Sequence, residues 1–250
     1  MEMEVTSKPR NKMSKLDALR LLNKFIKENN LAIGDKLPPE SELAELTGCS
    51  RLTLREALGV YREAGVIYSA QGKGTFICGD ITQIFNTLNN NLGLTEMIIA
   101  AGYEPGVSHF EKELIKASST VAGHLNIREG IDIIICKRLR TADGKPIVYT
   151  IDYFPPFLVP VFLERNDENM SFYELIENDA HLKIGNGRTE IFPLNCPEEL
   201  AEKFHCSEGW PLLGFKHVTS DAKGTPILYS EEYFLAESFN FFINRRRMRS

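Results

Sequence analysis

Apolar residues in the first quarter of the chain recur with the period of an α-helix, and the clearest pattern begins just after Ser50. One buried face is predicted by apolar residues spaced at i, i+3, i+4 and i+7, which are Leu54, Ala57, Leu58 and Tyr61. Ser50 is a good N-cap for this helix, because its hydroxyl can accept a hydrogen bond from a backbone N–H group of the first turn. The pattern therefore predicts an amphipathic helix.

Two shorter patterns precede this helix. Ser14 and Asp17 predict a capped start for a first helix, whose apolar residues are Leu16, Leu19, Leu22 and Ile26. A second helix is predicted to place Leu43 and Leu46 on its apolar side. Thr47-Gly48 then supplies the turn that joins it tightly to the third helix.

After Gly65 the pattern changes to that of extended chain. Apolar and β-branched residues flank the tip Gln71-Gly72-Lys73-Gly74, with Val66, Ile67 and Tyr68 before it and Thr75, Phe76 and Ile77 after it. This arrangement predicts a β-hairpin with a flexible basic tip. Glycines there would let the backbone come close to a phosphate, and Lys73 adds a counter-charge.

The third predicted helix carries arginines that suit nucleic-acid binding. Arg51, Arg55 and Arg62 lie within about 40° of one another at roughly 100° per residue, and two of them are in the first turns. Each feature alone is more often a solvated helix face or an ordinary hairpin. Three helices and a glycine-tipped hairpin in this order predict a winged helix-turn-helix. The turn between the helices, the N-cap, the arginine-bearing face and the hairpin all point to the same fold.

The stretch from 37 to 77 resembles the N-terminal DNA-binding domain of the GntR family of bacterial transcription regulators, in register at LPPE, SRLTLREAL and QGKGTF. The resemblance implies contacts with double-stranded operator DNA from the recognition helix and the wing, by Arg51, Thr53, Arg55, Gly72 and Lys73. The family usually has arginine where this chain has Ser41. That departure leaves the operator sequence open and does not argue against DNA binding.

Composition limits the class of protein. A length of 250 residues favours about two domains, and 43% apolar residues with mixed charges are typical of a globular chain. No apolar run is long enough to span a bilayer, and the first twelve residues are too polar for a signal peptide, so we expect a cytoplasmic protein. The five cysteines are scattered without CxxC spacing, which predicts reduced thiols and no zinc site.

The net charge of −5 is unevenly distributed. Residues 1–80 hold 12 basic and 11 acidic residues, whereas the remainder holds 17 and 23. A nearly neutral domain can bind DNA through a local basic face, but its affinity should then fall steeply with salt and depend on two copies binding together. The closing run Arg245–Arg249 is either a nucleic-acid tail or, more commonly, a solvated terminus.

An internal repeat organises the second half. The segment KRLRTADGKPIVYTIDYF (137–154) recurs as KHVTSDAKGTPILYSEEYF (216–234), each behind a short helical segment. Each copy predicts a helix, a strand, a turn and a strand. Two such hairpins should pair into one antiparallel sheet with helices on one face and a cleft where the halves meet. We predict a DNA-binding domain over 1–78, an Asn-rich linker over 79–92, and a second domain over 93–243.

The second half resembles the UTRA effector-binding domain of the HutC subfamily, which shares its fold with chorismate lyase. The resemblance rests on LTE (94–96), GYEP (102–105), RLR before DGKP (138–146), SFY (171–173) and GTP (224–226). It implies an α+β fold overall and a phosphate site formed by Thr95, Arg138, Arg140 and Ser171. Two arginines one residue apart on a strand share a face, and their forked donors suit phosphate or carboxylate.

Other interpretations of this half remain open. Arg138 and Arg140 could instead form structural ion pairs with nearby acids, which are Asp152, Glu231 and Glu232. Four tyrosines could line a sugar site or simply belong to the sheet: Tyr149, Tyr153, Tyr229 and Tyr233. Three departures from phosphosugar-sensing relatives predict a less polar pocket beside the anion clamp: Thr150, Leu228 and Phe234. The expected effector is a small anion, such as a phosphosugar, a phosphonate or a carboxylate.

Two functions follow from these patterns. The favoured one is a homodimeric transcription regulator, most simply a repressor, that binds a palindromic operator under the control of the effector. The alternative is an enzyme that uses the chorismate-lyase-like cleft. We find no nucleophile elbow, no metal-ligand spacing and no acid/base pair, so no catalytic residue, cofactor or metal is predicted.

Overall fold

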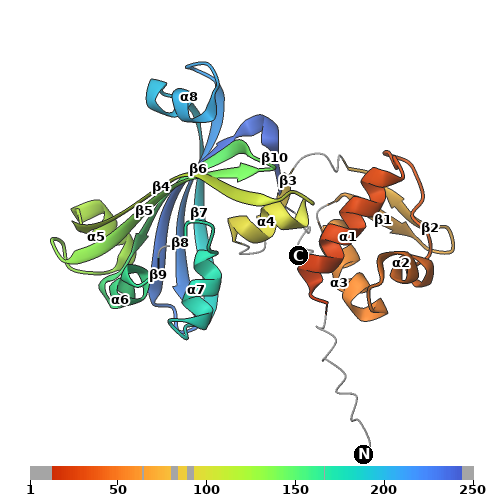
Figure 1. Cartoon of the computed structure of the whole chain (residues 1–250), viewed down its shortest axis with the longest axis horizontal. Coiled ribbons are helices and arrows are strands. Elements are labelled where there is room, and N and C mark those ends of the chain that lie inside the picture. The colour runs from red at the N-terminus through yellow and green to blue at the C-terminus, as the bar shows by residue number, and fades with distance from the viewer. Residues whose placement is uncertain (1–12, 64, 80–83, 89–92, 166, 244–250) are drawn as a thin grey trace, which may run out of the picture. The chain divides into compact units, whose positions relative to one another are not determined.

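A computed structural model describes residues 13–63, 65–79, 84–88, 93–165 and 167–243 (Figure 1). The chain divides into two compact units, Met1–Ile81 and Thr82–Ser250. Among the described residues, no helix is both long and apolar enough to cross a membrane. The closing Arg245–Arg249 run lies outside the described residues.

The first unit contains the three predicted helices and the hairpin. They are α1 (Lys15–Glu28), α2 (Glu40–Thr47), α3 (Arg51–Glu63), β1 (Ile67–Ala70) and β2 (Gly74–Ile77). Ser14 and Asp17 form a full capping box at the start of α1, as the sequence predicts. The apolar face predicted for α3 is also confirmed, since none of its four residues is more than 1% exposed.

The prediction for α2 is wrong at one position. Leu43 is buried, but Leu46 is 58% exposed. Ala44 and Thr47 share the buried face with Leu43 instead, and the Thr47 hydroxyl donates a hydrogen bond of 2.6 Å to the Leu43 carbonyl oxygen. Because these three residues lie within about 100° around the helix, Leu46 falls to the side of the buried face.

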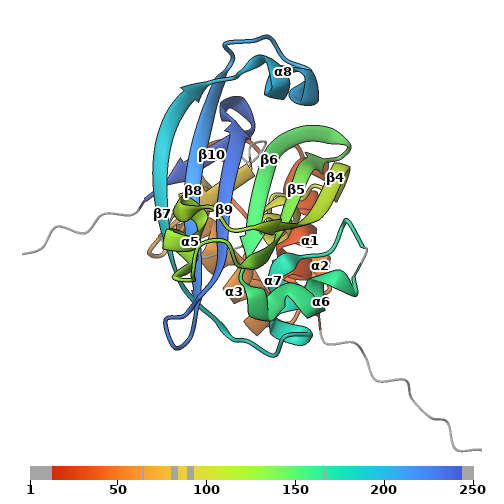
Figure 2. The same cartoon turned by 90° about the vertical axis from the view of Figure 1, so that its left-hand side faces the viewer.

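The second unit is built on a six-stranded antiparallel sheet in the order β4-β5-β6-β9-β8-β7 (Figure 2). Its strands are β4 (Pro105–Lys116), β5 (Asp132–Ala142), β6 (Lys145–Phe154), β7 (Ile184–Asn195), β8 (Pro211–Asp221) and β9 (Pro226–Leu235). The predicted repeat is confirmed: α5 (Ser119–Leu125) precedes the β5-β6 hairpin, and α8 (Glu198–Phe204) precedes the β8-β9 hairpin. The two hairpins meet where β6 pairs with β9.

The prediction that helices cover one face of this sheet is wrong. Apolar side chains of α5 and α8 pack on one face, through Ile133 and Leu139 of β5. The helices α4 (Leu94–Ala100), α6 (Val159–Leu163) and α7 (Phe172–Asn178) lie against the other, through Ile134 of β5 and Val148 of β6. Because α6 and α7 lie between the two copies and α4 precedes both, the repeat alone could not reveal this second layer.

The predicted linker over 79–92 contains a strand. β3 (Ile84–Thr87) pairs in parallel with β10 (Phe239–Phe242), which follows the short 3-10 helix η2 (Ala236–Ser238). Ile84 is buried with Met97 and Phe239 in the core of the second unit. A four-residue strand has too few apolar residues to stand out in a polar sequence. Residues 80–83 and 89–92 of the predicted linker lie outside the described residues.

Candidate functional site

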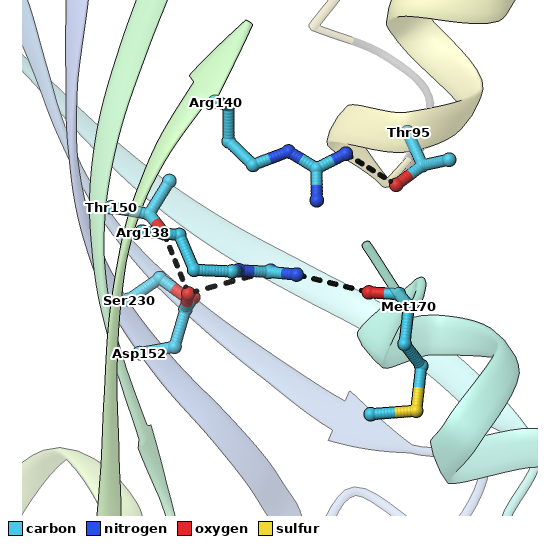
Figure 3. A network of polar contacts seen from close by, with 7 residues as sticks. All are labelled: Thr95, Arg138, Arg140, Thr150, Asp152, Met170 and Ser230. Atoms are coloured by element: carbon cyan, nitrogen blue, oxygen red, sulfur yellow. Dashed lines mark hydrogen bonds and ion pairs between the residues drawn. The ribbon is translucent and has the colours of Figure 1, made fainter. Parts of the chain in front are cut away.

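A cavity of about 90 Å³ opens on the face of the sheet that carries α4 and α7, at the seam between the two repeats. Its polar lining comes from both copies and includes Thr95, Arg138, Asp152, Ser171, His217 and Glu232. Three of the four predicted effector residues therefore line it. The fourth, Arg140, is on β5 and does not belong to the lining; its side chain is directed at Thr95 (Figure 3).

Arg138 is 5% exposed and is held on three sides. Its Nη1 donates a hydrogen bond of 3.0 Å to the Met170 carbonyl oxygen, and its guanidinium lies 3.4 Å from the centre of the Phe172 ring. Its Nη2 lies 3.7 Å from Asp152 Oδ2, which is an ion pair but longer than a hydrogen bond (Figure 3). Its Nε has no hydrogen-bond partner among the described residues.

Arg140 is 1% exposed and less well satisfied. Its Nη2 donates to Thr95 Oγ1 at 2.8 Å, while its Nε and Nη1 have no partner among the described residues. Burial, followed by the positive charge of Arg138, lowers the pKa of Arg140 to about 9. A buried donor without a partner typically costs about 1–3 kcal/mol, so the two guanidinium groups favour a bound molecule with acceptor oxygens.

Ser171 has a structural role in this conformation. Its side chain accepts a hydrogen bond from the Glu174 backbone N–H at 3.3 Å, which caps α7. Its hydroxyl also donates to Glu96 Oε1 at 3.2 Å. Binding of an anion by Ser171 would therefore require the hydroxyl to turn away from Glu96.

The pocket predicted to be less polar than that of phosphosugar-sensing relatives nevertheless has acids in its lining. Asp152 accepts hydrogen bonds from Thr150 at 2.8 Å and from Ser230 at 2.6 Å. Glu232 stands opposite Thr150 in the β6-β9 pairing. Burial, and then the charge of Asp152, raise the pKa of Glu232 to about 8. Leu228 and Phe234 do line the cavity, but strand alternation brings the acids to the same face.

The second copy carries different groups at the positions of the two arginines. When the repeats are aligned, Arg138 corresponds to His217 and Arg140 to Thr219. His217 Nδ1 lies 2.5 Å from Thr189 Oγ1, and burial lowers the pKa of His217 to about 4, so its ring is neutral at pH 7. The first copy thus contributes Arg138 together with its ion-pair partner Asp152, and the second copy contributes the neutral His217 ring. His217 could have been found from the repeat alignment.

The four tyrosines belong to the opposite face of the sheet and line no part of this cavity. Tyr229 and Tyr233 donate hydrogen bonds to Glu231 at 2.8 and 3.2 Å. Tyr149 packs in the core beneath α8. These side chains are therefore sheet residues, and Glu231 pairs with hydroxyls on this face and not with the arginines.

In the first unit, the predicted DNA-contacting residues differ in exposure and in hydrogen-bond partners. Arg51 is exposed, and so is Arg55, whose Nε donates to Glu40 Oε2 at 2.6 Å. Thr53 is half-buried, and its hydroxyl lies 2.7 Å from that of the N-cap residue Ser50. Ser41 is exposed on α2.

The hairpin tip has the backbone that its glycines predict. Gly72 and Gly74 have φ angles of +71° and +115°, which other residues rarely adopt. A Cβ atom on Gly74 would lie 2.5 Å from Lys36 Cε, so the Lys36 side chain lies against the tip. Lys36 thus adds a second amine to that of the exposed Lys73. The sequence pattern did not indicate Lys36, because it comes before α2 and forms only an isolated bridge with Phe76.

Two further observations concern chemistry that needs metals or thiols. Within the described ranges, no group of three or more His, Cys, Asp or Glu side chains could hold a metal ion. The five cysteines are free thiols, and the Sγ atoms of Cys196 and Cys206 lie 3.8 Å apart.

Comparison with known proteins assigns both units. Residues 16–77 match the bacterial regulatory proteins of the gntR family, and residues 100–240 match the UTRA domain. The chain belongs to the GntR family of transcription regulators and carries a UTRA domain, the combination expected of the HutC type. It is a DNA-binding transcription regulator.

Three relatives show how far this similarity extends. The HTH-type transcriptional regulator GmuR of Bacillus subtilis is 30% identical over 82% of this chain and 86% of its own length. The HTH-type transcriptional repressor NagR of the same organism is 26% identical over 86% and 88%. The crystal structure of PhnF from Mycobacterium smegmatis has the same fold, with a TM-score of 0.61 at 20% identity over 92% of this chain and all of that one.

Proposed function

We propose that this regulator is a cytoplasmic repressor that binds a palindromic operator as a homodimer and releases it when a small anion fills the cavity of the second unit. The observation that carries the effector proposal is the set of three buried arginine nitrogens without partners, Arg138 Nε and Arg140 Nε and Nη1. Ligand acceptor oxygens would satisfy them in charge-assisted hydrogen bonds. The name of NagR, a transcriptional repressor, supports repression.

The DNA-reading surface is proposed to consist of the start of α3 and the hairpin tip. Arg51 and Arg55 would contact bases or phosphates from the recognition helix. Thr53 could also contact the DNA once its hydroxyl turns away from Ser50. Gly72 would let the wing approach the backbone of the duplex, where Lys73 supplies a charge. Arg55 must leave Glu40 to do so, and both side chains are accessible enough to rearrange.

The effector is proposed to be a phosphosugar, a phosphonate or a carboxylate with hydrogen-bonding groups at its other end. The anion would lie on the side of Arg138 and Arg140, with Thr95 and Ser171 near it. His217 and Glu232, from the second copy, would face the remainder of the molecule, while Asp152 stays paired with Arg138. This distribution of charge favours a ligand with one anionic end over a symmetric dianion.

Effector control requires two states of the dimer. The anion can shift the operator equilibrium only by its difference in affinity for the DNA-binding and released states. Two copies per operator match the two half-sites of a palindrome and would offset the small basic excess of the first unit.

One observation favours an enzyme as the second candidate. The pKa of Glu232, raised to about 8, lies in the range of a general acid or base at neutral pH. A turnover screen with small anionic metabolites tests it directly. Product that accumulates in proportion to protein, and that Glu232→Gln abolishes, would support catalysis.

The experiment that tests the repressor proposal is a thermal-shift screen followed by DNA titration. Phosphorylated sugars, phosphonates and small carboxylates are added to the full-length protein, and the unfolding temperature is recorded. A stabilising anion should then weaken binding to a duplex obtained by in vitro selection. An anion that stabilises the protein but strengthens DNA binding would contradict release, and the absence of any selected duplex would contradict operator binding.

A further inference from the structure

A leucine occupies the most outward position of the recognition helix. Leu52, the second residue of α3, is 70% exposed, more than the other exposed apolar side chains Ile33 at 65% and Leu46 at 58%. Its side chain lies about 170° around the helix from the centre of the buried face, at roughly 100° per residue. Leaving such a side chain in water is unfavourable, and no packing within the described part of the unit explains it.

The neighbours of Leu52 place it on the proposed base-reading surface. Arg55 lies about 60° to one side of it and Glu56 about 40° to the other, at roughly 100° per residue. All three side chains are exposed. Leu52 belongs to the first turn, and N-terminal residues of a recognition helix are the ones that meet base edges in the major groove.

A glycine two turns further along α3 lies on the same face of the helix as Leu52. Gly59 lies within about 20° of Leu52 around the helix, at roughly 100° per residue. A Cβ atom there would meet nothing within 4 Å, so no packing among the described residues requires glycine. Glycine inside a helix costs roughly 0.5–1 kcal/mol relative to alanine, and a bare position on this face allows a partner to approach closely.

We propose that Leu52 is a specificity-determining residue that recognises the 5-methyl group of a thymine in the major groove. Leucine has no donor or acceptor, and the thymine methyl is the apolar group that base edges display there. Every other base edge would lose water from a polar atom against the leucine without a replacement hydrogen bond. This inference rests on the proposed operator binding and adds a base preference to it.

The test uses deoxyuridine, which differs from thymidine only by the missing methyl. A duplex is selected from random DNA with the full-length protein, and each thymine is then replaced singly by uracil. Synthetic DNA contains no 5-methylcytosine, so any methyl effect comes from thymine. One position per half-site should bind about fourfold more weakly with uracil, as expected for one buried methyl group.

The variant Leu52→Ala should bind thymine and uracil duplexes equally, with an unchanged unfolding temperature because the side chain is exposed. The matched control Leu163→Ala alters another exposed leucine, on α6 of the second unit, and should keep the fourfold difference. If uracil has no effect at any position, or if Leu52→Ala keeps the same sensitivity, the inference is wrong. If no duplex is selected at all, operator binding itself fails, which is a different result.

Discussion

The arginines proposed to bind ligands differ between the two units in solvent exposure and in hydrogen-bond partners. Arg55 has a side chain that is 68% exposed and is paired with Glu40, whereas Arg140 is 1% exposed and has two nitrogens without partners among the described residues. The exposed arginine keeps its hydration and can exchange one partner for another at little cost. The buried arginine loses its hydration already when the protein folds, before any ligand binds. If these arginines bind DNA and effector as proposed, the first unit would rearrange its side chains on binding, while the second would already hold its arginine in place.

The largest expected effect comes from removing the buried charge. Arg140→Met should weaken effector binding about 100-fold or more, because two charge-assisted hydrogen bonds of about 1.5–3 kcal/mol each would be lost. The unliganded variant should unfold at a higher temperature, because burial disfavours the charged side chain. Calorimetry with a screened anion and a thermal scan measure both properties. Arg188→Met, at an 83% exposed side chain on β7, is the control that should change neither.

A lower unfolding temperature for unliganded Arg140→Met would contradict the proposal that Arg140 is held in place, at a cost in stability, before the effector binds. It would mean that Arg140 stabilises the fold by pairing with acids such as Asp152 and Glu96.

The next effect concerns the exposed arginine. Arg55→Ala should weaken operator binding about 5- to 150-fold and lower the salt slope, while effector-induced stabilisation stays intact. Arg62→Ala, in the last turn of the same helix, should have a smaller effect because it is remote from the base-reading end. Fluorescence anisotropy at several salt concentrations measures both. Equal losses for the two variants would show that α3 contributes only a diffuse charge.

A pH series sharpens the description of the pocket. The pKa of Glu232 is raised from 4.5 to about 8 in the folded protein, so its contribution to stability is full below about pH 4.5 and is lost as pH rises toward 8. Glu232→Gln should therefore flatten the fall in unfolding temperature between these values. An anionic effector should also bind more weakly above pH 8, where Glu232 is charged. An unchanged slope in the variant would assign the pH dependence to another group.

The smallest effect tests whether loss of stability alone can mimic these results. Ser14→Ala removes the capping box of α1 and should cost about 0.5–2 kcal/mol of stability. Denaturant unfolding measures this change. Operator affinity and effector affinity at 25 °C should both remain as in the wild type. A loss of operator affinity would mean that the first unit unfolds too readily for the Arg55 variant to be interpreted.

The sequence predicted local structure well, because short-range patterns determine it. The capping residues Ser14 and Asp17, the apolar face of α3 and the glycine tip at Gly72 each act within a few residues. The repeat also predicted that the two hairpins meet in one sheet. The error at Leu46 arose because Ala44 and Thr47, which look less apolar, complete the buried face.

Long-range structure was less accessible. The acids in the pocket depend on the pairing of Thr150 with Glu232 and of Asp152 with Ser230, a register that no local pattern displays. The strand β3 depends on a partner near the end of the chain. The predicted DNA contacts and effector contacts remain predictions until a ligand is bound, and the structure adds Lys36 and Leu52 to the residues worth testing.

The pairing of β3 with β10 has a consequence for synthesis on the ribosome. More than 150 residues separate Ile84 from its partner Phe239, so β3 leaves the ribosome long before β10 exists. The first unit can fold in the meantime from local contacts, whereas Ile84 and Met97 wait for Phe239 to complete their cluster. A chain that stops before Phe239 would retain every residue of the recognition helix and leave this cluster open. Such a fragment would keep an intact DNA-binding unit but would lack an intact effector-binding unit.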